Sequence, residues 1–109
     1  NNLSNRLGET GRREDALAAI TEAVDLYREL ARQQPDVYRP DLASSLNNLA
    51  VRLGDSGRRS EALAELSEAV EIRRQLTEVR PELHEEDLEQ SLRVSSWLRT
   101  GGGQAWANS

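Results

Sequence analysis

An internal repeat is the feature that most restricts how this sequence can fold. The segment Asn1–Gly8 (NNLSNRLG) returns 46 positions later as Asn47–Gly54 (NNLAVRLG), and the match continues as far as Pro35 and Pro81. A third, shorter copy begins after Pro81. Recurrence over such a period predicts a stack of similar structural units, in which each unit covers the apolar face of its neighbour.

The apolar residues within each copy are spaced as on one face of an α-helix. Steps of three or four residues separate the second-copy residues Leu42, Leu46, Leu49 and Leu53. A polar break with two glycines at 54–59 leads to a second stripe over 62–76, where Arg73 replaces an apolar residue. We expect five helices, at about 1–9, 13–33, 41–55, 59–79 and 86–99, with boundaries at Pro35 and Pro81 because the residue before proline disfavours helix.

Composition narrows the functional classes. The chain of 109 residues has 14 basic residues, all arginine, against 19 acidic ones, and the net charge of −5 disfavours nucleic acid as a partner. It has no cysteine for thiol chemistry, and its single histidine offers neither a pair of metal ligands nor an obvious general base. We therefore predict no cofactor and no enzymatic activity. No apolar run is long enough to cross a membrane. We expect a cytoplasmic, bacterial protein with an aliphatic core, and the missing initiator methionine suggests a fragment of a longer chain.

The repeated unit resembles the tetratricopeptide repeat. The residues that carry the resemblance in the second copy are Leu46 and Leu49 in the first helix, Gly57 at the turn, and Ala62 and Ala69 in the second helix. Their first-copy counterparts are Leu3, Gly11, Ala16 and Ala23. The alanines let neighbouring helices approach closely. The unit exceeds the family's usual length of about 34 residues, which resembles the kinesin-light-chain type found in bacterial arrays.

The resemblance implies an all-α fold, a right-handed α-solenoid of about two and a half helix–turn–helix units. The first unit would cover residues 1–35 with a truncated first helix, and the second would cover 36–80. Residues 81–100 would form a capping helix that represents a partial third unit, and residues 101–109, which begin with three glycines, a flexible tail.

Tetratricopeptide repeats are interaction scaffolds, and the resemblance implies a concave groove lined by the first helix of each unit. The groove-facing positions of the family correspond to Asn1, Asn2, Asn5, Glu9, Ser44, Asn47, Asn48, Val51 and Asp55. Asparagine offers donors and an acceptor that suit the backbone of an extended peptide. We therefore predict a non-catalytic scaffold that binds a protein or peptide partner. Alternatively, the asparagines only hydrate an exposed face or cap a neighbouring helix.

A structural role is the second hypothesis. The chain would then be an oligomerisation spacer of a larger bacterial signalling protein, and would self-associate through an N-terminal edge at Leu3 and Leu7 or through the tail around Trp106. Trp97 would either brace the capping helix or lie in the groove. We interpret the paired arginines at 12–13 and 58–59 as parts of solvated turns. The acidic residues at 78–89 are best explained by the start of a helix, where the helix dipole favours carboxylates.

Overall fold

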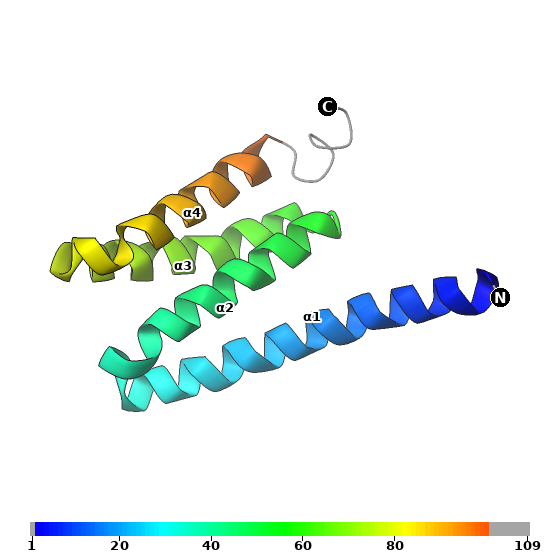
Figure 1. Cartoon of the computed structure of the whole chain (residues 1–109), viewed down its shortest axis with the longest axis horizontal. Coiled ribbons are helices and arrows are strands. Elements are labelled where there is room, and N and C mark those ends of the chain that lie inside the picture. Colours follow the sequence, from blue (N-terminus) through cyan, green and yellow to red (C-terminus); the bar gives the residue numbers. More distant parts are fainter. Residues whose placement is uncertain (1, 101–109) are drawn as a thin grey trace.

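The computed structural model describes the backbone of residues 2–100 and the side chains of residues 14–100. Within these limits the chain forms four α-helices and no strand, which are α1 (Asn2–Gln33), α2 (Pro35–Asp55), α3 (Arg59–Val79) and α4 (Pro81–Arg99). Successive helices run antiparallel and each packs on the next, so that the helices follow chain order across the molecule (Figure 1). α2 also contacts α4. This is the predicted all-α helical repeat.

The first copy of the repeat differs from the prediction, because α1 is one continuous helix. The expected break at residues 8–12, between helices at 1–9 and 13–33, is absent. In the second copy a turn does separate α2 from α3, which pack on each other as helices of 21 residues each. Gly8 and Gly11, the two glycines of the expected break, therefore lie inside α1.

The prolines begin helices instead of forming linkers. Pro35 and Pro81 occupy the first turns of α2 and α4, whereas the sequence predicted helix starts near 41 and 86. Proline suits this position because its missing N–H would have no partner inside the helix and its φ is already helical. Residues 36–40, predicted as a linker, are therefore helical, and Pro40 lies inside α2.

The turn between α2 and α3 forms where the sequence predicted it. Gly57 adopts a φ of +79°, which is strained for residues that carry a Cβ. The N–H of Arg58 donates to the carbonyl of Leu53 at 2.9 Å, and the N–H of Gly57 donates to the carbonyl of Gly54 at 3.0 Å. These two bonds satisfy carbonyls at the end of α2 in the pattern of a Schellman motif. The turn reverses the chain, so that α3 packs along α2.

The core is aliphatic, as the composition predicted. Leu46 and Leu66 are 0% and 1% exposed, and they lie between α2 and α3 with other buried leucine, valine and isoleucine side chains. Ala62 and Ala69 are fully buried, which agrees with their predicted role at positions of close helix approach. Aromatic residues lie at the edge of this core, where the rings of Tyr27 and Tyr38 have centroids 6.5 Å apart.

Candidate functional site

A stripe of mostly polar side chains lies along one side of α2. Ser44, Asn48, Val51 and Asp55 are spaced by three or four residues, which places them on the same side of the helix. Ser44, Asn48 and Asp55 are exposed, and Val51 is half-buried. The opposite side of α2 carries the buried leucines that contact α3. The stripe is therefore accessible to a partner, and we call these four residues the α2 stripe.

Asn47, the fifth predicted groove residue of α2, lies inside the protein. It is only 4% exposed, and its Oδ1 accepts a hydrogen bond of 2.9 Å from the hydroxyl of Ser91 on α4. One residue corresponds to about 100° of rotation around a helix, so Asn47 faces α4 while Asn48 faces solvent. The prediction that Asn47 is presented to a peptide is therefore wrong for this arrangement. Its amide joins two helices.

The Ser91 hydroxyl belongs to a buried polar network centred on Arg73. Arg73 Nη1 donates to Ser91 Oγ at 2.6 Å and to the backbone carbonyl of Asp87 at 3.0 Å, and Nη2 donates to Ser44 Oγ at 3.3 Å. The residue is 5% exposed. Burial lowers the pKa of the Arg73 guanidinium, and the nearby Asp87 carboxylate opposes that shift. Arg73 thus extends from α3 between α2 and α4 and bonds to both.

On α4 three residues correspond in the repeat to the α2 stripe. Gln90, Val94 and Trp97 stand 46 positions after Ser44, Asn48 and Val51. Gln90 is exposed, whereas Val94 and Trp97 are half-buried. From the sequence, Trp97 was predicted either to brace the capping helix or to lie in the groove. Gln90 was not among the predicted site residues. The signal that could have found Gln90 is its correspondence to Ser44.

Gly54 allows α2 and α4 to approach each other next to Trp97. A Cβ placed on Gly54 would lie 2.6 Å from Leu98 Cδ2 and 2.9 Å from Trp97 Cζ3. Both distances are shorter than van der Waals contact, and Leu98 is fully buried. Trp97 therefore packs against the end of α2 and forms part of the contact between the two helices.

Gly54→Ala is expected to destabilise the protein by about 1–2 kcal/mol. Overpacking against Leu98 and Trp97 should outweigh the gain in helix propensity, which is about 1 kcal/mol for an exposed position. Urea unfolding followed by circular dichroism and by Trp fluorescence measures the change. Unchanged or increased stability would show that α4 moves aside without cost.

The predicted site residues of the first copy cannot be placed in the same way. Asn1 lies outside the described residues, and the side chains of Asn2, Asn5 and Glu9 lie outside the part of the chain whose side chains are described. The same holds for Leu3 and Leu7 of the predicted self-association edge, and Trp106 is not described. The candidate site therefore consists of the α2 stripe and its α4 counterparts.

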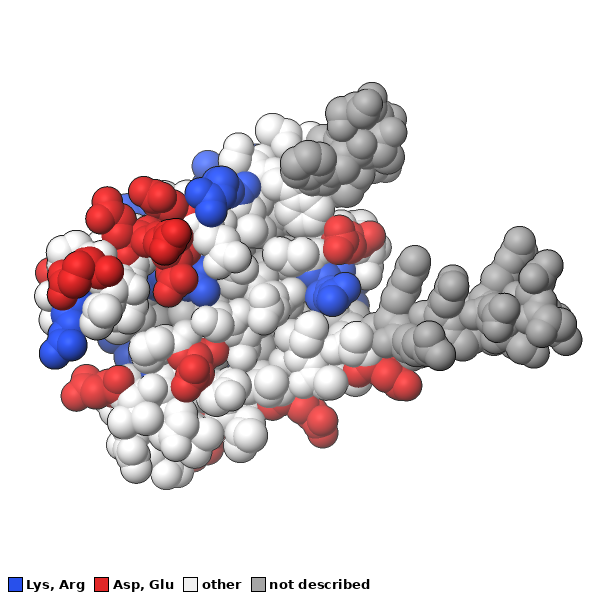
Figure 2. All heavy atoms as spheres, in the orientation of Figure 1, with Lys and Arg blue, Asp and Glu red and all other residues white. Residues whose placement is uncertain are grey.

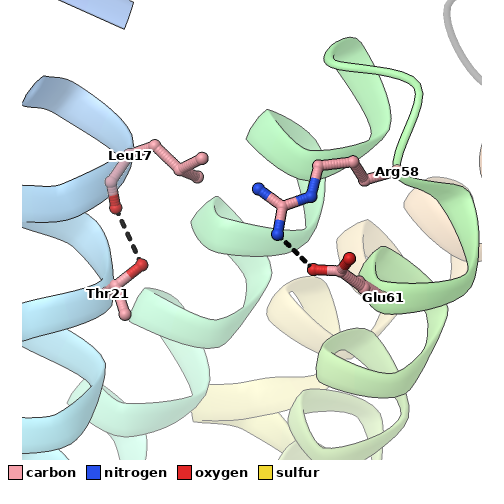
Figure 3. A network of polar contacts seen from close by, with 4 residues as sticks. All are labelled: Leu17, Thr21, Arg58 and Glu61. Carbon is pink, nitrogen blue, oxygen red and sulfur yellow. Dashed lines mark hydrogen bonds and ion pairs between the residues drawn. The ribbon is translucent and has the colours of Figure 1, made fainter. Parts of the chain in front are cut away.

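Charged features outside this site have structural explanations. Arg58 donates to Glu61 at 2.5 Å at the start of α3, and both side chains are exposed (Figure 3). This pair agrees with the solvated turn predicted for the arginines at 58–59. Acidic side chains gather over the first half of α4 (Figure 2), and Glu82 lies in the first turn, where a carboxylate interacts favourably with the helix dipole. His84 is half-buried in the same helix.

None of the four helices that the structure describes is long and apolar enough to span a membrane. Among the side chains of residues 14–100, no three histidine, aspartate or glutamate residues lie close enough together to hold a metal ion.

The stacked antiparallel helices and the 46-residue period place this chain in the class of α-helical repeat proteins. The family model described as Tetratricopeptide repeat matches residues 1–36 and 42–79, which is more than half of the chain. The chain belongs to the tetratricopeptide repeat family. Repeats of this family generally mediate protein–protein interactions and are generally not catalytic. Comparisons with curated proteins and with solved structures gave no significant match.

Proposed function

We propose that this chain is a non-catalytic interaction module that binds an extended peptide segment of a partner protein along the α2 stripe and its α4 counterparts. The observation that carries the proposal is the exposure of Ser44, Asn48 and Asp55 in one row on α2, beside the α4 row that contains Gln90. Hydroxyl and amide groups in such a row can pair with the N–H and C=O groups of a peptide backbone.

The base of this surface is well suited to hold its shape. Arg73 bonds to the Ser44 hydroxyl and to the α4 backbone, and Asn47 bonds to Ser91. These contacts keep the two rows at a constant spacing, and a preorganised surface loses less entropy when a ligand binds. The half-buried Val51 and Trp97 add apolar area between the polar groups. We therefore expect the partner segment to combine an exposed backbone with one or two apolar side chains.

Random peptides displayed on phage and selected on the wild-type chain provide the probe. Val51→Arg places a long charged side chain in the middle of the α2 stripe, and we expect it to weaken binding of the selected peptides by about tenfold or more. The double variant Ser44→Ala with Asn48→Ala should weaken binding by a similar factor, because each lost hydrogen bond is worth about 1 kcal/mol. Fluorescence anisotropy of labelled peptides gives the Kd values.

A matched control separates this surface from a general effect of added charge. Ala64 is exposed on α3, so Ala64→Arg makes a comparable change of size and charge away from the α2 stripe and should leave peptide affinity unchanged. Selection that enriches no peptide would contradict the proposal. Enriched peptides that bind Val51→Arg as tightly as the wild type would also contradict it.

A further inference from the structure

The docking of α3 onto the pair α1 and α2 shows how one helix is added to this array. α3 buries Ala62, Leu66, Ala69 and Ile72, which are between 0% and 7% exposed. The helices that receive it bury Val24 of α1 and Leu46 of α2 in the same core. An ion pair of 2.5 Å between Arg28 Nη1 of α1 and Glu68 Oε2 of α3 lies beside this contact.

α1 carries the same face as α3, but here that face is largely uncovered. The residues 46 positions before those buried on α3 are Ala16, Ile20, Ala23 and Leu26, and we call them the α1 face. Leu26 is 60% exposed, whereas its counterpart Ile72 is 7% exposed. Ala16, Ile20 and Ala23 are half-buried, whereas their α3 counterparts are buried. The α1 face thus has the chemistry of a docking face without the partner that α3 has.

The pair α3 and α4 carries the receiving surface a second time. A groove between these helices is lined by Leu63, Val70, Arg74 and Leu92, and we call it the α3–α4 groove. Their counterparts 46 positions earlier are Leu17, Val24, Arg28 and Leu46. Leu92 is 44% exposed where Leu46 is 0% exposed, and Val70 is half-buried where Val24 is 3% exposed. Leu17 of α1 and Leu63 of α3 are both partly buried side chains at the edge of the core, so Leu63 is available to a further helix as Leu17 is to α3.

We propose that the α1 face of a second copy of this chain docks into the α3–α4 groove, in the register in which α3 docks onto α1 and α2. The register can be checked by charge. Arg74 corresponds to Arg28, and Glu22 of α1 corresponds to Glu68. Docking therefore brings Glu22 of the second copy to Arg74, which reproduces the ion pair between Arg28 and Glu68. Glu22 and Arg74 are both exposed and accessible for this contact.

The proposed interface joins two different surfaces, so the copies assemble head to tail. Such a contact repeats from copy to copy and does not close at two, unlike a symmetric dimer. α4 of one copy and α1 of the next copy would then stand side by side as α2 and α3 do within the chain. This inference uses other residues than the α2 stripe, and so it stands or falls independently of peptide binding.

The first test is the mass of the wild-type chain in solution. Sedimentation velocity over a concentration series should show a distribution that moves to higher multiples of 12.2 kDa as concentration rises. A single copy at every concentration would overturn the proposal. A mass that stops at two copies would also overturn it, because head-to-tail contacts leave a free surface at each end.

The decisive test is complementation between two variants. Leu26→Arg disrupts the α1 face, Leu92→Arg disrupts the α3–α4 groove, and each residue is exposed enough to be replaced without unfolding the chain. Each variant alone should be a single copy, with association weakened on the order of 100-fold. Mixing the two should give heterodimers that stop at two copies, since each variant retains one intact surface. No association in the mixture, or association of either variant alone, would overturn the proposal.

Two controls complete the experiment. Ala64→Arg changes an exposed position of α3 outside the groove residues and should leave the assembly unchanged. Deleting residues 101–109 should also leave it unchanged, and loss of assembly in this variant would assign the contact to the C-terminal residues instead. Glu22→Arg and Arg74→Glu should each weaken self-association, because each places like charges across the contact. Their mixture should recover the higher multiples, because every contact between unlike variants then pairs an acidic with a basic residue.

Discussion

Arg73→Ala is expected to lower the free energy of unfolding by about 3 kcal/mol. Arg73 lies on α3, and among the described side chains of that helix it alone donates hydrogen bonds to both α2 and α4. Four hydrogen bonds of a charged donor are lost, and the space of a long side chain that is 5% exposed is left empty. The Ser91 hydroxyl keeps its bond to Asn47. Urea unfolding at a protein concentration too low for association measures the change.

Two further variants show which part of Arg73 matters. Arg73→Met keeps most of the side-chain volume without the charge, and we expect it to cost about 1 kcal/mol, since the desolvation of the guanidinium is relieved as its hydrogen bonds are lost. Arg74→Ala removes the exposed neighbouring arginine of the same helix and should change stability by less than about 0.5 kcal/mol. A loss below about 1 kcal/mol for Arg73→Ala would contradict the role of the network.

The direction of the Arg73 pKa shift also gives an expectation for pH. Burial lowers the pKa in the folded protein below its value in the unfolded chain, so the charged form is the less favourable one for folding. Its effect on stability is constant at all pH values well below the folded pKa, which includes neutral pH. Stability would increase only as the pH rises through that folded value in the strongly alkaline range. The loss caused by Arg73→Ala should therefore not vary around neutral pH.

Leu46→Ala is expected to cost about 3–4 kcal/mol, which is a large part of the stability of a small domain. Leu46 is fully buried in the contact of α2 with its neighbours, and the cavity left by its side chain would be enclosed by the other core residues. Unfolding in urea, again in dilute solution, measures the loss. Near-ultraviolet circular dichroism shows whether the remaining packing is intact.

The repeat supplies a matched control for this variant. Leu92 occupies the position of Leu46 in the third copy, but it is 44% exposed. Leu92→Ala makes the same chemical change and should cost less than about 1 kcal/mol in dilute solution. Equal losses for the two variants would mean that Leu92 is covered within a single copy, which would contradict both the observed exposure and the α3–α4 groove as a docking surface.

Much of the fold could be predicted from local sequence signals. The α3 boundaries at residues 59 and 79 agree with the prediction, because a glycine turn precedes the helix and a proline follows it. The end of α2 at Asp55 and the burial of Ala62 and Ala69 also agree. These features depend on neighbours within a few residues or on the spacing of apolar positions, and both can be read directly from the chain.

The candidate site was less predictable, because exposure on a helix depends on which other helix covers each side. Asn47 and Asn48 are adjacent and chemically identical, yet Asn47 bonds to Ser91 while Asn48 is exposed. Arg73 could be recognised from the sequence as an exception in an apolar stripe, but not as a residue that contacts both α2 and α4. Its partners are brought together only by the packing of three helices.

The sequence by itself determined the repeat, its helical period and the family. Only the tertiary structure decided which copy of each repeated residue is covered. Leu46 and Leu92 share one position in the repeat, as do Ile72 and Leu26, but one member of each pair is buried and the other is largely accessible. The physical reason is that burial belongs to the contact between helices, and equivalent residues differ in whether a neighbouring helix is present to cover them.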